Sequence, residues 1–161
     1  MTTAKEIEEL NTRLSNSKPT DIIQEASELW PNLAISFSGA EDVALIDMAS
    51  KMIDAPAIFT LDTGRLHGQT YEFIESVRKH YELPIETLHP DPQQLSRLIQ
   101  DKGLFSFYED GHQECCSIRK VAPLRSKLAT VDAWITGQRR DQSPTRGEVP
   151  IIQVDSTFSN P

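Results

Sequence analysis

Two adjacent cysteines, Cys115 and Cys116, are the most chemically distinctive residues of this sequence, and the chain contains no others. Neighbouring Cα atoms lie about 3.8 Å apart across a trans peptide, below the roughly 4.4–6.8 Å that a relaxed disulfide needs. A disulfide between them would therefore be strained. The alternative is two thiolates on one soft metal centre, and both zinc and iron–sulfur clusters usually take four protein ligands. The pair is either inert or part of a larger ligand set.

Positive charge is concentrated in the segment that follows the cysteines. Between Ser117 and Gly147, seven basic and two acidic residues give +5, whereas the whole 161-residue chain carries −8. An acidic chain is a poor general binder of nucleic acid, so we expect no such partner. A local cationic patch favours a small anionic ligand. The basic residues are Arg119, Lys120, Arg125, Lys127, Arg139, Arg140 and Arg146.

The first candidate loop has the sequence S-F-S-G-A-E-D and follows an apolar run that is typical of a buried parallel strand. Ligands of open α/β sheets bind beyond the carboxyl ends of strands, where the N–H groups of a following helix favour an anion. Helix capping alone explains these residue types equally well. The loop lacks a Walker or G-x-G-x-x-G pattern. Its candidate binding residues are Ser36, Ser38, Gly39, Glu41 and Asp42.

The second candidate loop, L-D-T-G-R, follows the next strand and would reach the same edge of the sheet. The acid and the hydroxyl could bind a base or sugar, and the arginine a phosphate. Taken alone, the loop fits an Asx turn with glycine at positive φ better. Its residues are Leu61, Asp62, Thr63, Gly64 and Arg65.

The third candidate joins the cysteine segment to the string G-Q-R-R-D-Q-S-P-T-R. Arginine forks match phosphate or sulfate oxygens in pairs, which makes Gly137, Arg139, Arg140 and Arg146 candidates for an anion site. Lys120 lies four residues beyond Cys116, about one helical turn, where its charge would stabilise a thiolate or a negatively charged cluster.

Strands alternating with helices must position these residues, which predicts an α/β fold with a largely parallel sheet flanked by helices. By length we expect one domain, with a helical segment at residues 1–32 and an α/β domain at 33–161. We predict helices at 4–14, 19–29, 40–52, 68–80, 92–102 and 114–128, the last broken or kinked at Pro123. We predict strands at 33–38, 57–60, 85–88, 133–136 and 151–154.

The cellular setting follows from what the sequence lacks. It has no apolar stretch of about eighteen residues, so we expect no membrane span. The acidic, amphipathic N-terminus lacks the apolar run of a secretory signal. With only two cysteines, these features favour the reducing cytoplasm.

Five strings together resemble the assimilatory sulfonucleotide reductases, and specifically their adenosine 5′-phosphosulfate (APS) reductase branch. They are I-S-F-S-G-A-E-D, L-D-T-G-R-L-H, G-L-F-S-F-Y, G-H-Q-E-C-C-S-I-R-K and G-Q-R-R-D-Q-S-P. The resemblance implies an adenine nucleotide α-hydrolase-like fold. It also implies reduction of APS to sulfite and AMP in sulfate assimilation, with electrons from thioredoxin.

The same resemblance assigns the candidate residues. It makes Ser36–Asp42 the phosphosulfate loop, Leu61–Arg65 the nucleotide loop and Gly137–Arg146 the arginine-rich loop of a nucleotide-binding domain. Lys120 becomes the lysine beside a [4Fe–4S] cluster, and the cysteine pair supplies two of the four cluster ligands. Because relatives that reduce the 3′-phosphorylated substrate (PAPS) usually lack this pair, the resemblance favours APS.

The sequence departs from this family in one large respect. The family's second cysteine pair and its nucleophilic cysteine have no counterpart here, so we expect the nucleophile beyond Pro161 and a missing C-terminal part. We predict the N-terminal, substrate-binding portion of an APS reductase, inactive by itself. The alternatives are a PAPS reductase and a non-catalytic nucleotide-binding module. In the latter, a homodimer could pool two cysteine pairs around one cluster.

Overall fold

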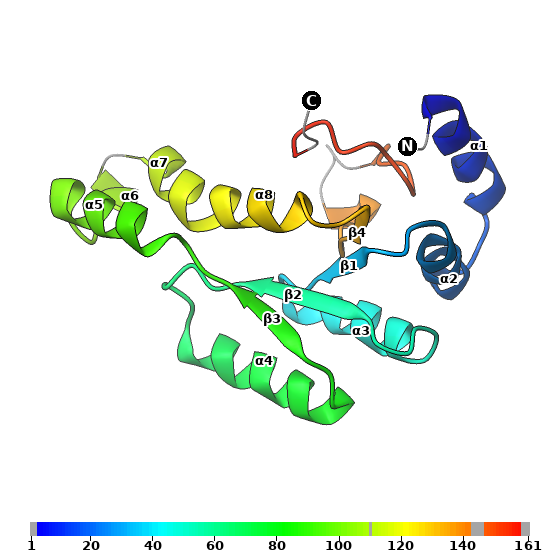
Figure 1. The fold of residues 1–161 in the computed structure, drawn as a ribbon, viewed down its shortest axis with the longest axis horizontal. Helices are drawn as coiled ribbons and strands as arrows, with labels where there is room; N and C mark the ends of the chain where they lie inside the picture. The colour runs from blue at the N-terminus through cyan, green and yellow to red at the C-terminus, as the bar shows by residue number, and fades with distance from the viewer. Residues whose placement is uncertain (1–2, 110, 143–146, 159–161) are drawn as a thin grey trace.

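A four-stranded parallel sheet is the centre of the computed structural model, which describes residues 3–109, 111–142 and 147–158 (Figure 1). The strands lie in the order β3-β2-β1-β4, and every pairing is parallel. Their bounds are β1 Leu33–Ser36, β2 Ala57–Leu61, β3 Ile85–Leu88 and β4 Ala133–Ile135. This arrangement confirms the predicted α/β class.

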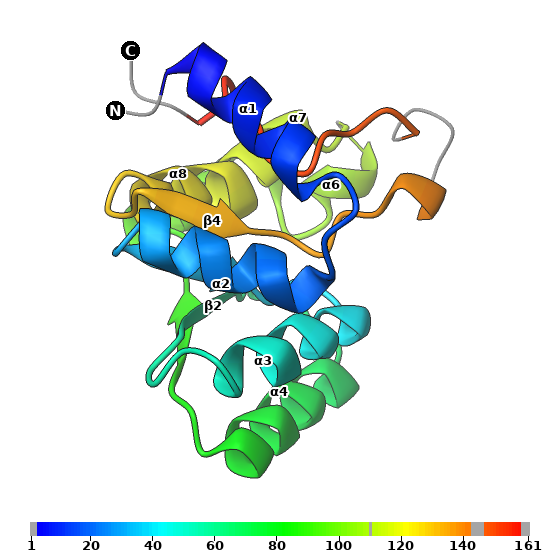
Figure 2. The same cartoon turned by 90° about the vertical axis from the view of Figure 1, so that its right-hand side faces the viewer.

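Helices cover both faces of the sheet. Figures 1 and 2 show α3 and α4 on one side and α8 on the other. The helix bounds are α1 Ala4–Leu14, α2 Pro19–Leu29, α3 Val43–Ser50, α4 Gly68–Tyr81, α5 Pro92–Lys102, α6 Ser106–Glu109, α7 Gln113–Cys116 and α8 Ala122–Leu128. Short 3-10 turns, η1 Ala40–Asp42 and η3 Arg140–Gln142, follow β1 and β4.

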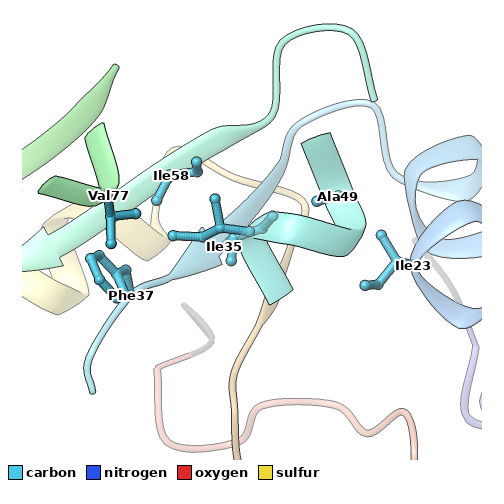
Figure 3. Packing of buried hydrophobic residues seen from close by; sticks show 7 residues of the cluster. Ile23, Ile35, Phe37, Ala49, Ile58 and Val77 are labelled. Carbon is cyan, nitrogen blue, oxygen red and sulfur yellow. The ribbon is translucent and has the colours of Figure 1, made fainter. Parts of the chain in front are cut away.

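The two covered faces explain why the central strands are apolar in consecutive positions. On the first face, Ile35 and Ile58 pack with Ile46 of α3 and Val77 of α4, and Ile23 of α2 belongs to the same cluster (Figure 3). On the opposite face, Ala34 and Phe59 pack with Leu128 of α8. Strands buried on both sides lose the polar alternation of a half-exposed sheet. The proposed division of the chain at residue 32 stays a prediction.

Local chemistry sets most of the helix ends where the sequence predicts them. Thr3 and Glu6 form a capping box at the start of α1. Asp91 accepts a hydrogen bond from the Gln94 amide at the start of α5, directly before Pro92. Gly103, at a φ of +74°, ends that helix. Such caps act over three or four residues, so they can be predicted from sequence alone.

The predicted helix over residues 114–128 is a more complex element. It consists of α7, a π-helical segment η2 at Ser117–Val121, and α8, whose first turn contains Pro123. Proline has no N–H group to donate to the carbonyl of Arg119, and its ring crowds that carbonyl. The turn before it widens instead, and the Ala122 amide donates to the carbonyl oxygen of Ser117. The predicted irregularity therefore lies just before the proline.

The predicted strand at residues 151–154 is wrong. The segment is irregular, and its backbone pairs with a side chain of α1 in place of a neighbouring strand. The Asn11 amide group donates to the Ile152 carbonyl at 2.7 Å, and its oxygen accepts from the Ile152 amide at 3.0 Å. A single asparagine thus satisfies both backbone groups that a strand partner would otherwise satisfy. Figure 2 shows α1 beside this C-terminal segment.

Removing the Asn11 amide should loosen the C-terminal segment. Each lost hydrogen bond costs about 0.5–1.5 kcal/mol, so we expect Asn11→Ala to lower the free energy of unfolding by about 1–3 kcal/mol. Urea unfolding followed by circular dichroism measures this. Gln24→Ala is the control, since Gln24 is exposed on α2 and its side-chain amide donates to the exposed Glu28 of the same helix. Equal stability of the two variants would contradict the role of Asn11.

Candidate functional site

The strand order creates a switch point at the carboxyl ends of β1 and β4. The chain runs from β1 to β2 and β3 on one side, and then crosses to β4 on the other side of β1. Connections that leave adjacent strands in opposite directions open a crevice where ligands of such sheets bind. The loops after β1 and β4 both lie there, and they contain the first set of candidate residues and Gly137, Arg139 and Arg140 of the third set.

The loop after β1 is folded around the carboxylate of Asp42. This side chain is buried, with 6% of its surface exposed. Its Oδ2 accepts hydrogen bonds from the Ser38 amide and hydroxyl, both at 2.8 Å, and from the Gly39 amide at 2.9 Å. Asp42 therefore shapes the loop from within. Ser36 ends β1 and is paired with Phe59, whereas Gly39 and Glu41 are exposed.

The loop after β4 approaches this carboxylate so closely that it requires a glycine. A Cβ atom on Gly137 would lie 1.7 Å from Asp42 Oδ1 and 2.9 Å from its Cγ. Real Cβ atoms essentially never approach other atoms so closely. The two loops are thus in direct contact, and Gly137 is needed for space, not for an unusual φ.

Arg139 connects the same two loops at the surface. Its Nη1 lies 2.6 Å from Glu41 Oε2, and its Nε lies 3.3 Å from Asp141 Oδ1. The hydrogen bond to Glu41, followed by the charge of that group, raises the pKa of Arg139 above its ordinary value. Arg140 is exposed and donates from Nε to the Val149 carbonyl at 2.9 Å. Arg146 lies outside the described residues.

The loop Leu61–Arg65 after β2 is the Asx turn that its local pattern favours. Asp62 Oδ1 accepts from the Gly64 amide at 2.8 Å and from the Tyr71 hydroxyl at 2.9 Å. Gly64 has a φ of +70°. The hydrogen bond to Asp62 raises the pKa of Tyr71. Arg65 is exposed, with its guanidinium carbon 5.7 Å from the centre of the Tyr108 ring.

The cysteine pair ends α7, next to the π-helical segment. Both thiols are free; Cys115 is buried and Cys116 is half-buried. Lys120 is exposed. Arg119, between the cysteines and Lys120, was counted in the cationic patch but was not among the candidate site residues. It is 6% exposed, and its Nη1 donates to the Thr63 carbonyl at 2.6 Å. Its position four residues after Cys115 was the signal available in the sequence.

The donors in the described part of the chain meet only half of a cluster's requirement. A [4Fe–4S] cluster takes four protein ligands, and the chain offers two neighbouring thiols. Among residues 3–109, 111–142 and 147–158, no group of three or more His, Cys, Asp or Glu side chains could hold a metal ion.

No helix in those ranges has both the length and the apolar character to cross a bilayer.

The fold matches that of a sulfonucleotide reductase. A crystal structure of phosphoadenylyl-sulfate (PAPS) reductase from Candida auris, in a phosphate complex, superposes with a TM-score of 0.81. The match covers 98% of this chain and 76% of that one, at 24% sequence identity. At this identity the likeness shows the fold, and it confirms the predicted adenine nucleotide α-hydrolase-like class.

Sequence comparison then identifies the family. The phosphoadenosine phosphosulfate reductase domain matches residues 32–160, so the chain belongs to that family. Adenosine 5′-phosphosulfate reductase of Pseudomonas aeruginosa (strain LESB58) is 54% identical over 158 residues, which are 94% of this chain and 58% of that protein. 5′-Adenylylsulfate reductase 1, chloroplastic, of Arabidopsis thaliana is 53% identical over 156 residues, 96% and 34% of the respective chains. The chain thus spans 58% or less of the length of these relatives.

A methyl group at Gly137 should force the two loops apart. We expect Gly137→Ala to lower the free energy of unfolding by about 1–3 kcal/mol, the usual cost of overpacking. Thermal unfolding measures the loss. Gly39→Ala is the matched control, because a Cβ there meets no atom within 4 Å and the backbone is extended. If both variants unfold at the wild-type temperature, the close approach of Gly137 to Asp42 is not needed.

Proposed function

We propose that this chain is the substrate-binding portion of an assimilatory APS reductase, an oxidoreductase of sulfate assimilation. The complete reaction would reduce adenosine 5′-phosphosulfate to sulfite and AMP with thioredoxin as electron donor, in the cytoplasm. The family and the names of the 53–54% identical relatives support this class of reaction. The observation that carries the proposal is the contact between the loops after β1 and β4 at the switch point.

Within this proposal the phosphosulfate group lies between the two loops. The Asp42 carboxylate accepts hydrogen bonds from Ser38 and the Gly39 amide, and these bonds fix the conformation of the loop after β1. Arg139 and Arg140 would neutralise the anion. Lys120 would add a positive charge next to the cysteine pair in the sequence. Arg139 is bonded to Glu41 in the ligand-free chain, so an arriving anion must replace that carboxylate.

The Asx turn Leu61–Arg65 is proposed to bind the nucleoside part of the substrate. The loop lies at the end of β2, the strand adjacent to β1, so it borders the same edge of the sheet. Asp62 keeps Gly64 in its positive-φ conformation and leaves the loop backbone exposed at that residue. Direct contact of Ser36, Leu61, Asp62, Thr63 or Arg65 with substrate stays a prediction.

Cys115 and Cys116 are proposed as two of the four thiolate ligands of a [4Fe–4S] cluster. Such a cluster would supply a negatively charged redox centre beside the cationic loop. The described residues do not complete its ligand set. The remaining two thiolates would come from another polypeptide segment or from a second copy of this chain.

The arginine that joins the two loops should dominate affinity for the anion. A hydrogen bond to a charged group contributes about 1.5–3 kcal/mol, so we expect Arg139→Gln to weaken APS binding about 10- to 100-fold. Calorimetric titration measures this, with Arg125→Gln as the control because Arg125 is exposed on α8. Undiminished APS binding by Arg139→Gln would refute the placement of the anion.

A competition titration against bound AMP separates the APS and PAPS alternatives. The family description and the Candida auris structure both name the 3′-phosphorylated substrate, whereas the closely similar curated relatives are named for APS. We expect APS to compete with AMP more strongly than PAPS does. Tighter binding of PAPS would favour the PAPS reductase alternative. Binding of AMP alone would favour a nucleotide-binding module.

The 161-residue chain should bind substrate without turning it over. Sulfite release by this family requires a thiol that takes up the sulfur, and a serine hydroxyl cannot form the thiosulfonate that thioredoxin would reduce. The chain's only two thiols are assigned to the cluster. We expect no thioredoxin-dependent sulfite above a blank without protein. Thioredoxin-dependent sulfite from the wild-type chain would contradict this expectation, and its loss in the Cys115→Ser or Cys116→Ser variant would identify that thiol as the nucleophile in place of a cluster ligand.

A further inference from the structure

Arg119 is a buried cation with incomplete hydrogen bonding. The side chain lies in the π-helical segment η2 and is 6% exposed. Its Nη1 donates to the Thr63 carbonyl at 2.6 Å. Its Nε is buried and has no hydrogen-bond partner within the described part of the chain. The guanidinium therefore donates a hydrogen bond to the loop Leu61–Arg65, while its own Nε–H group stays without an acceptor.

This placement is unfavourable for stability alone. Burying a charge costs several kcal/mol unless it is paired, and replacing a buried ionic group by an apolar side chain of similar volume is often neutral or stabilising. An unsatisfied buried donor adds about 1–3 kcal/mol. A long apolar residue would fill the same space at lower cost. Such a group is expected where it serves a function that an apolar side chain cannot.

The contact links two parts of the site that are distant in sequence. Arg119 and Thr63 are 56 residues apart, and the Thr63 side chain is itself buried. Gly64 follows directly, and a Cβ placed on it would lie 3.4 Å from Arg119 Nη1. On the other side, Arg119 stands three and four residues after the two cysteines on one continuous helical path. The guanidinium thus touches the loop and belongs to the cysteine segment.

We propose that Arg119 is a positioning residue that couples the loop Leu61–Arg65 to the cysteine pair. The guanidinium fixes the Thr63 carbonyl and with it the Asx turn around Gly64. Occupation of that turn by a nucleotide stiffens the loop, and the bond to Arg119 passes this restraint to the helix that holds Cys116. By thermodynamic linkage, the state of the cysteine segment then changes affinity at the loop. The nucleotide half of this inference rests on the proposed function.

The test uses the 161-residue chain and the variant Arg119→Met, which keeps most of the volume and removes every donor. Hydrogen exchange by mass spectrometry reports the peptide that covers Leu61–Arg65. Alkylation of the half-buried Cys116 by iodoacetamide, with and without AMP, reports the coupling. Arg125→Met is the matched control on the exposed face of α8. Arg119→Lys replaces the Met variant if that chain does not fold.

We expect Arg119→Met to unfold at a temperature no lower than the Arg125→Met control. Its Leu61–Arg65 peptide should exchange at least about fivefold faster than wild type, the consequence of losing a charged hydrogen bond. AMP should slow Cys116 alkylation in wild type and leave it unchanged in the variant. A merely structural role would lower the unfolding temperature and speed exchange across the whole chain, with no selective effect on the Leu61–Arg65 peptide.

Two results overturn the inference separately. Unchanged exchange of the Leu61–Arg65 peptide in Arg119→Met would refute the hold of Arg119 on the loop, whatever AMP does. Equal AMP protection of Cys116 in wild type and variant would refute the coupling. Absence of AMP binding to the wild-type chain would instead overturn the proposed nucleotide site, and the exchange comparison would still decide whether Arg119 positions the loop.

Discussion

The buried carboxylate of Asp42 is the contact on which the candidate site depends. A desolvated carboxylate is costly unless donors surround it. Here Ser38 and the Gly39 amide supply three hydrogen bonds to one oxygen, and the other oxygen lies against Gly137. The requirement to satisfy one charge therefore fixes the shape of the loop after β1 and brings the loop after β4 into contact with it. The parallel sheet provides the two strand ends, and Asp42 decides how close their loops come.

The arginine side chains of the loop after β4 depend on this contact between the two loops. Arg139 reaches across from the loop after β4 and bonds to Glu41 of the loop after β1. In the proposed function that carboxylate holds the guanidinium in place until the anionic substrate replaces it. The exchange of one anionic partner for another lowers the net free energy gained on binding. The cysteine pair and Lys120 lie on α7 and η2, and the Arg119–Thr63 bond joins that segment to the loop after β2.

Much of the fold could be predicted because its determinants are local. Apolar runs marked β1 and β2, Pro92 and Gly103 marked the ends of α5, and the motif strings marked the family. The failures involve contacts through space. The segment 151–154 has the composition of a strand, but its partner is Asn11, 141 residues away. The inward role of Asp42, the space restriction at Gly137 and the burial of Arg119 likewise depend on neighbours that no local pattern reveals. Pro123 predicted an irregular helix, but not that a π-helical turn would absorb it.

The central claim is that an anionic nucleotide binds between the loops after β1 and β4. Titration of the isotopically labelled chain with APS, followed by the backbone amide resonances, tests it most directly. The account predicts that the largest shifts fall on Ser38–Asp42 and on residues 137–142, with smaller ones on Leu61–Arg65. Shifts confined to other surfaces, such as α5 and α7, or the absence of any saturable shift at these loops, would contradict it.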